Sequence, residues 1–140
     1  MRRFTLIGIV AALVAAGTAR ADVYVIVTTT TVHVGGFLRG TGDGSGLSFY
    51  LVPYARRPPV TRCGANGLCA ARTRRAPRAP YVYLGRLRKT RNFYALERFR
   101  FRVPRVRPGR YGVVVWCPPC GGSLILAGAT ARGQVVTVRR

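Results

Sequence analysis

Residues Leu96–Val103 read LERFRFRV, the clearest strand pattern in the chain. Successive side chains of a β-strand point to opposite faces, so a strand here has one apolar face, formed by Phe99, Phe101 and Val103. Its other face is formed by Arg98, Arg100 and Arg102. The stretch therefore predicts a half-buried strand with one face against a core and one face in water.

The flanking sequence extends this pattern in both directions. Pro108-Gly109 predicts a turn, and the apolar run Gly112–Trp116 that follows it in the sequence is long enough for a central strand. Short runs bounded by Gly or Pro predict strands near 23–28, 31–39, 46–54, 81–88, 95–103, 110–117, 122–127 and 133–139. We expect an all-β fold, a single immunoglobulin-like antiparallel β-sandwich of about 7–8 strands, with a small barrel as the alternative.

Two stretches interrupt the predicted strands. Residues 55–80 contain seven arginines and show no period, so they predict a long Arg/Pro-rich loop. Gly40–Gly46 is rich in glycine and predicts a hairpin turn.

The N-terminal residues MRRFTLIGIVAALVAAGTARA have the three-part plan of a secretory signal peptide. Their apolar run of 13 residues is shorter than the ~20 residues of a membrane-spanning helix. We expect a signal peptide over 1–21, removed after Ala21, and one mature domain over 22–140 with no transmembrane segment. The expected location is secreted or extracytoplasmic, with retention at the cell envelope as one form of it.

The charge balance is the most unusual property of the chain. Without Arg2, Arg3 and Arg20, 21 basic residues remain against 3 acidic ones, a net charge of +18. A small soluble domain ordinarily has a net charge of about 2–8 in magnitude. Seventeen of the 24 basic residues lie between Arg56 and Arg110, which concentrates the positive field on the middle of the chain.

These arginines predict an anion-binding surface, formed by Arg98, Arg100 and Arg102 together with Arg86 and Arg88. Alternate residues of a strand lie about 6.6 Å apart, which is comparable to the repeat of a phosphate-bearing polymer. The expected partners are anionic cell-envelope polymers or lipid headgroups, without specific readout of nucleic acid. Tyrosines near the basic stretches could stack on bases or sugars, namely Tyr50, Tyr54, Tyr81, Tyr83 and Tyr94. The alternative is a solvated outer face with no ligand.

Four cysteines, Cys63, Cys69, Cys117 and Cys120, become disulfides in an exported protein. Two connectivities are considered, either the two local pairs Cys63–Cys69 and Cys117–Cys120 or a cross-link from the long loop to the strand end, and the local pairs are favoured. The first pair is too widely spaced for a zinc knuckle, so we expect no metal and no cofactor.

Residues Trp116–Cys120 read WCPPC, which is the signature of thioredoxin-like oxidoreductases. In that fold the first cysteine begins a helix, whose dipole lowers the pKa of the thiol. Here Gly121–Gly128 is rich in glycine and β-like, so a helix is not expected. A structural disulfide is the favoured interpretation, and a thiol–disulfide oxidoreductase with Cys117 as the nucleophile is the alternative function.

His33 and Glu97 are the only histidine and the only glutamate, and an acid–base pair of this kind would suit a small ribonuclease. His33 lies in a Thr/Val strand and Glu97 precedes Arg98, so an outward-facing histidine and a surface ion-pair partner are the favoured roles. We therefore expect no catalytic residue and no enzymatic activity.

The segment FRVPRVRPGRYGVVVWCPPCGG, followed by the C-terminal VVTVRR, resembles small secreted proteins of high-GC Gram-positive (actinobacterial) bacteria. These share a Pro-Gly-x-Tyr turn, a valine-rich strand and a Cys-x-x-Cys. The resemblance implies an exported immunoglobulin-like sandwich of unknown function and assigns no catalytic residue. With the charge, it predicts a non-enzymatic module of the envelope or extracellular space that contacts anionic polymers through arginine.

Overall fold

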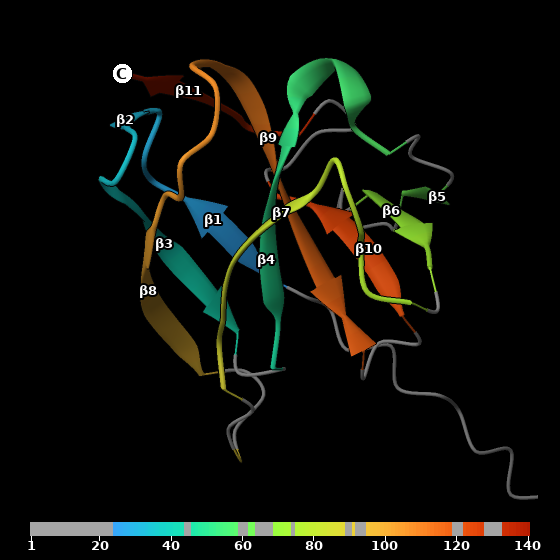
Figure 1. The fold of residues 1–140 in the computed structure, drawn as a ribbon. Helices are drawn as coiled ribbons and strands as arrows, with labels where there is room; N and C mark the ends of the chain where they lie inside the picture. Colours follow the sequence, from blue (N-terminus) through green and yellow to red (C-terminus); the bar gives the residue numbers. More distant parts are fainter. Residues whose placement is uncertain are drawn as a thin grey trace, which may run out of the picture.

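The computed structural model describes residues 24–43, 46–58, 62–63, 69–73, 75–88, 91, 95–118, 122–127 and 133–140, with the backbone alone for 62–63, 69–72 and 123. The expected signal peptide over 1–21 lies outside these residues. The described part of the chain is all-β, with its strands in two sheets (Figure 1). It contains no α-helix, and η1 (Tyr54–Arg56) is a single 3-10 turn. No helix in this part is long and apolar enough to cross a membrane.

The smaller sheet has the order β1-β3-β8 and is antiparallel. Its strands are β1 (Val25–Val27), β3 (Phe37–Asp43) and β8 (Leu96–Arg102). The strand predicted near 95–103 is therefore confirmed, and so is its alternation, because Phe99 is buried while the three arginines are exposed. The alternation places β8 with its aromatic face inward and its arginine face in water.

The larger sheet is built around β9 (Gly109–Cys117). One side of β9 pairs with β4 (Ser48–Pro53), and β4 pairs in turn with β7 (Val82–Arg86). The other side of β9 pairs with β11 (Val135–Arg139) along its first half and with β10 (Ser123–Leu126) along its second half. The sequence predicted each of these strands to within a few residues of its observed bounds.

The expected antiparallel arrangement is wrong at one edge of the larger sheet. There β2 (Thr31–His33) pairs with β11 in parallel, with Val32 opposite Val138. Only Thr28–Thr30 separate β1 from β2, and the chain changes sheet there instead of forming a hairpin, so β2 meets β11 running in the same direction. The single strand expected over 31–39 is likewise two strands, because the chain turns at Gly35, where φ is +80°.

The long loop expected over 55–80 is only partly a loop. It contains β5 (Arg62–Cys63) and β6 (Cys69–Arg72), and β6 pairs with β10, so the hairpin extends the larger sheet. These strands are too short to show a period in the sequence. Their pairing covers a backbone edge of β10 that would otherwise be open.

The hairpin expected around Gly40–Gly46 is wrong, because Gly40–Asp43 belong to β3 in the smaller sheet, whereas the next strand, β4, lies in the larger sheet and does not pair with β3. A Cβ at Gly40 would collide with the backbone oxygen of Ile26 and with the ring of Phe99. Glycine is needed here because strand β3 and the Phe99 ring approach one another closely.

Two apolar clusters cover the two faces of β9. Between the sheets, Phe49 packs its ring centroid 4.6 Å from that of Phe99 and 5.1 Å from that of Phe101. Val113 and Val115 of β9 belong to this main core. Val114 points to the opposite face and packs in a second cluster with Val52, Leu124 and Leu126, against which Tyr81 and Trp116 lie. Strand β9 is therefore buried on both faces, whereas β8 is buried on one.

Candidate anion-binding site

The outer face of the smaller sheet gathers four exposed arginines, which we call the arginine face: Arg39, Arg98, Arg100 and Arg102. The last three are the predicted row on β8, and their side chains share one side of the strand. Arg39 comes from β3, where it lies directly opposite Arg100. Sequence reasoning missed Arg39 as a member of the surface, because its place depends on a strand pairing between residues that are far apart in the chain.

Like charges directly opposite one another on a sheet repel, so the Arg39–Arg100 pair is unfavourable without an anion. The guanidinium carbon of Arg100 lies 3.7 Å from the ring centroid of Phe37, a cation–π contact that fixes where this side chain rests. A shallow pocket of about 370 Å³ opens between Arg39, Arg98 and Arg100, with Thr28 and Thr41 also lining it. The guanidinium groups and the Thr41 hydroxyl are donors that suit an oxyanion, whereas the hydroxyl of Thr28 donates to the backbone oxygen of Arg39 at 3.2 Å.

Two acidic residues among the described ones, Asp43 and Glu97, lie on the same strands as the arginine face. Asp43 is 3% exposed, and its Oδ2 accepts a hydrogen bond from the backbone N–H of Tyr24 at 2.9 Å. Glu97 has the same strand parity as Phe99, so its side chain leaves β8 on the side opposite the arginines. Neither acid therefore projects as an exposed group among the four guanidiniums.

Arg86 and Arg88, the other two predicted anion-binding residues, are exposed but lie on the larger sheet, at the end of β7 and just after it. The Nε–H of Arg86 donates to the backbone oxygen of Gly46 at 3.3 Å. The structure therefore does not bring these two residues onto the arginine face.

The tyrosines proposed as stacking platforms differ in exposure. Tyr50 and Tyr81 lie in or against buried regions, and burial raises the pKa of both phenols, with the nearby Tyr83 raising that of Tyr50 further. The ring of Tyr54 has guanidinium carbons of Arg57 and Arg110 over it, at 3.7 and 4.9 Å from its centroid. Tyr83 is 55% exposed, and Tyr94 lies outside the described residues. Of the four predicted stacking tyrosines that the structure describes, Tyr83 is the most exposed, and its ring makes an edge contact with that of Tyr50 at 5.5 Å between centroids.

His33 and Glu97 are not brought together. His33 lies in β2, beside the turn that leads into the Phe37 end of β3, whereas Glu97 pairs with Gly42 at the other end of that strand. Phe37 and Gly42 are five residues apart along β3, a distance of about 17 Å, so His33 and Glu97 lie near opposite ends of this strand. The Nδ1–H of the exposed His33 donates to the backbone oxygen of Arg140 at 2.5 Å. An acid–base pair needs hydrogen-bond reach to one substrate atom, and this arrangement does not provide it.

The strand register limits how the cysteines can pair. Cys117 is disulfide-bonded. The side chain of its partner cysteine is not among those that the structure describes. Cys117 is level with Ser123 of β10 and, through it, with Arg72 of β6. With strands about 4.8 Å apart and a rise of about 3.3 Å per residue, Cys69 lies about 14 Å from Cys117 between Cα atoms. A disulfide needs less than about 7 Å, so a Cys69–Cys117 cross-link does not fit this sheet.

Cys63 lies one strand further out and directly opposite Cys69 in the β5–β6 hairpin. Directly opposite residues of an antiparallel pair have Cα atoms about 4.5–5.5 Å apart, which is within the range of a disulfide. Cys120 lies outside the described residues.

The described residues contain no group of three or more His, Cys, Asp or Glu side chains that could hold a metal ion. No protein-family model matches the chain, and no curated protein matches it either.

Proposed function

We propose that this protein is an exported, non-enzymatic module whose arginine face binds an anionic polymer of the cell envelope or extracellular space. The observation that carries the proposal is that Arg39, Arg98 and Arg100, exposed on two neighbouring strands, line one pocket on the outer face of the smaller sheet. Arg102 continues the row on β8, and its Nε–H donates to the backbone oxygen of Gly35 at 3.3 Å. The net charge adds a long-range field that raises the local concentration of any polyanion.

The geometry of the face supports an extended ligand over a compact one. The three arginines of β8 follow one another at a spacing of about 6.6 Å along the strand, and Arg39 widens the row at its centre. A chain of phosphates, sulfates or carboxylates can contact several of these guanidiniums at once, and each contact releases a counterion.

Chromatography on immobilised heparin, a sulfated glycan, tests this proposal. The mature domain should remain bound beyond about 0.5 M salt, where screening has removed weak surface attraction. Elution near about 0.15 M salt would contradict the proposal. Sedimentation with vesicles of anionic lipid, compared with neutral vesicles, separates binding of headgroups from binding of a polymer.

We infer that the two sheets form an immunoglobulin-like sandwich. Two features support this finer assignment beyond the all-β class. The hydroxyl of Tyr111, near the start of β9, donates to the backbone oxygen of Arg107 at 2.6 Å, as in the tyrosine corner of such domains. The first strand is also divided between the two sheets, as β1 and β2.

We further infer that the cysteines form the two local pairs, Cys63–Cys69 and Cys117–Cys120. The register favours the first pair, and the distances between strands leave Cys120 as the partner of Cys117. Mass mapping of a digest prepared without reductant should find both pairs. A peptide that joins Cys63 or Cys69 to Cys117 or Cys120 would disprove this connectivity.

The same features argue against the oxidoreductase alternative. A thioredoxin-like nucleophile is an accessible thiolate at the start of a helix. Cys117 is 0% exposed at the end of β9, and the next described element is the strand β10. An insulin-reduction assay with the Cys117→Ala variant as the control should therefore show no difference between the two proteins.

A further inference from the structure

In the part of the chain that the structure describes, strand β8 is paired along one side and leaves its other backbone edge open. The N–H of Val103 donates to the oxygen of Gly36 at 2.8 Å, and the N–H of Gly35 donates to the oxygen of Val103 at 2.9 Å. Both backbone groups of Val103 therefore point toward the β3 side, and along an antiparallel strand this direction alternates from residue to residue. Phe101 and Phe99 consequently bond to β3, whereas the N–H and C=O groups of the three arginines point away from it.

The hydrogen bonds on the other side of β3 show the same alternation of backbone direction. Arg39, opposite Arg100, accepts a hydrogen bond from the N–H of Thr28 at its backbone oxygen, at 2.9 Å. Arg39 thus bonds toward β1, and Arg100 has no backbone partner on β3. Within the described residues β8 pairs with β3 alone, so Arg98, Arg100 and Arg102 present their backbone groups at the free edge of the smaller sheet.

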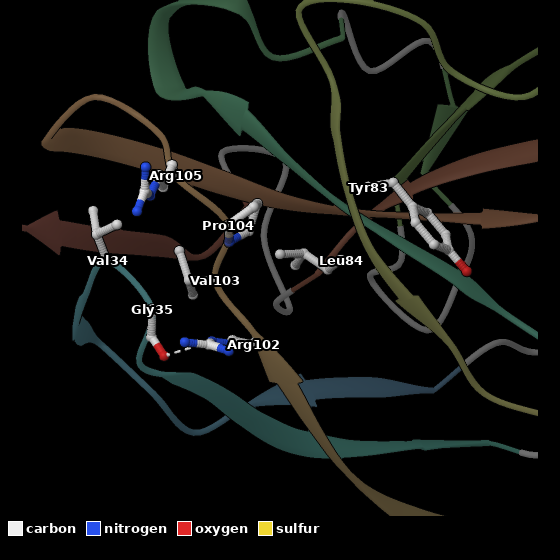
Figure 2. Close-up of a pocket in the computed structure, with 8 residues that line it drawn as sticks. All are labelled: Val34, Gly35, Tyr83, Leu84, Arg102, Val103, Pro104 and Arg105. Carbon is white, nitrogen blue, oxygen red and sulfur yellow. Dashed lines mark hydrogen bonds between the residues drawn. The ribbon is translucent and has the colours of Figure 1, made fainter.

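The apolar interior is also open along this side of the molecule. A pocket of about 690 Å³ lies between the end of β8 and strand β7, with Leu84, Val103 and Pro104 in its apolar wall and Arg102 and Arg105 also lining it (Figure 2). Apolar side chains that pack on the core near this pocket are only partly buried, namely Val34, Val82, Leu84 and Phe101. Immunoglobulin-like sandwiches of the constant type have a fourth strand beside the one equivalent to β8, and the described chain has none there.

We propose that the free edge of β8 binds an extended acidic peptide as an added β-strand. Its backbone would pair with Arg98, Arg100 and Arg102, and alternate side chains would lie over their guanidiniums. The intervening side chains would face the pocket between β8 and β7. The ligand that fits has carboxylates at every second position and apolar residues between them.

Charge and chemistry select this ligand over two others. A second copy of the chain would bring another strongly positive surface against the same arginines, which is unfavourable. A polyphosphate or glycan has no peptide groups to pair with a strand edge and no apolar side chains for the pocket. The proposal therefore goes beyond binding of a polyanion, although it uses the same three side chains.

A titration with a synthetic peptide of alternating Glu and Val tests the proposal. Its control peptide has the same composition, with the glutamates grouped at one end so that charge is conserved and alternation is lost. We expect the alternating peptide to bind at least about tenfold more tightly, because only it can pair with the edge and fill the pocket together. Equal affinity for the two peptides would overturn the proposal.

A matched pair of variants separates the backbone edge from the charge. Arg100→Pro removes the guanidinium and the edge-facing N–H, whereas Arg100→Thr removes only the guanidinium. Proline is tolerated on an edge strand where the N–H faces solvent. Arg100→Pro should weaken peptide binding at least about tenfold more than Arg100→Thr does, while both lose the same heparin retention. Equal peptide binding by the two variants would contradict strand addition.

Amide hydrogen exchange on the unmodified protein gives a readout that does not depend on how the variants fold. The amides of the three arginines should exchange quickly in the free protein and become protected with the alternating peptide, while that of Phe99 is protected in both. Peptide binding without this protection would show attachment to the charged face alone and would overturn the proposal. If the protein is retained on heparin but does not bind the peptide, the strand-addition proposal is wrong and the proposed function stands. If the peptide binds with protection of these amides but heparin does not retain the protein, the proposed function is wrong and the strand-addition proposal stands.

Discussion

Strands β8 and β9 follow one another along the chain but lie in different sheets and in opposite surroundings. β9 is central, is paired on both sides and has apolar side chains packed on both faces. β8 is at an edge and has arginines on its outer face. This difference separates two tasks, since burial of β9 stabilises the domain while the exposed groups of β8 remain available for a partner.

The largest effect expected from this contrast is on stability. Val113→Asp places an unpaired carboxylate at a position that is 0% exposed, and we expect a loss of about 4 kcal/mol or more in the free energy of unfolding. Arg98→Asp introduces the same side chain on the wet face of β8 and should change that free energy by less than about 0.5 kcal/mol. Urea unfolding followed by circular dichroism measures both, and similar losses for the two variants would refute the contrast.

A pair of glycines sharpens the contrast within the strands. Gly40→Ala should destabilise by about 1–3 kcal/mol, because the new methyl group would meet a backbone oxygen and the Phe99 ring. At Gly112 of β9 the nearest atoms to such a methyl group are 3.6 Å away, an ordinary contact, so Gly112→Ala should be neutral or slightly stabilising. Thermal unfolding of both variants tests this, and a stable Gly40→Ala protein would be the contrary result.

The turn between β8 and β9 depends on one hydrogen bond of Tyr111. Tyr111→Phe removes the donor to the oxygen of Arg107 and should cost about 1 kcal/mol, with no change in heparin retention. Denaturant titration beside a heparin column measures the two quantities. A loss of retention that exceeds the loss of folded protein would link this corner to the binding face.

The smallest expected effect is at alkaline pH. Burial raises the pKa of Tyr50 and Tyr81 above the ordinary value of 10.0, so the folded protein holds these protons more tightly than the unfolded chain does. The associated stability is fully present below pH 10 and is lost as pH rises through the folded pKa. Tm measured across this window should fall, and that of Tyr50→Phe should fall less steeply than that of the unmodified protein. An identical slope in the two proteins would count against burial as the cause.

Much of the fold could be predicted from the sequence because its signals are local. The alternation around Phe99 and Phe101 requires only a two-residue period, and the valine run of β9 requires only a buried strand. Pairing is different, because it joins residues far apart in the chain. The parallel contact of β2 with β11 and the β5–β6 hairpin have no local pattern that would reveal them.

The candidate site divides in the same way. The three arginines of β8 could be placed on one face from their spacing alone, whereas Arg39 joined them only through the register of β3 with β8. Arg86 and Arg88 lie on the other sheet, and their position relative to the β8 row also depends on strand pairing that no local pattern reveals. The direction in which the backbone groups of β8 point, and the side on which the core is open, could not be predicted from the sequence either, because both depend on which strands pair.

The most direct test compares two variants with the same change in charge. Arg98, Arg100 and Arg102 are replaced by Glu in one, and Arg56, Arg75 and Arg78, which are exposed elsewhere, are replaced by Glu in the other. If the arginine face binds the polyanion, the β8 variant should elute from heparin at about half the salt that the control variant needs, or less. Elution of both variants at the same salt would show that overall charge alone holds the polymer, and the account of β8 as the binding strand would be wrong.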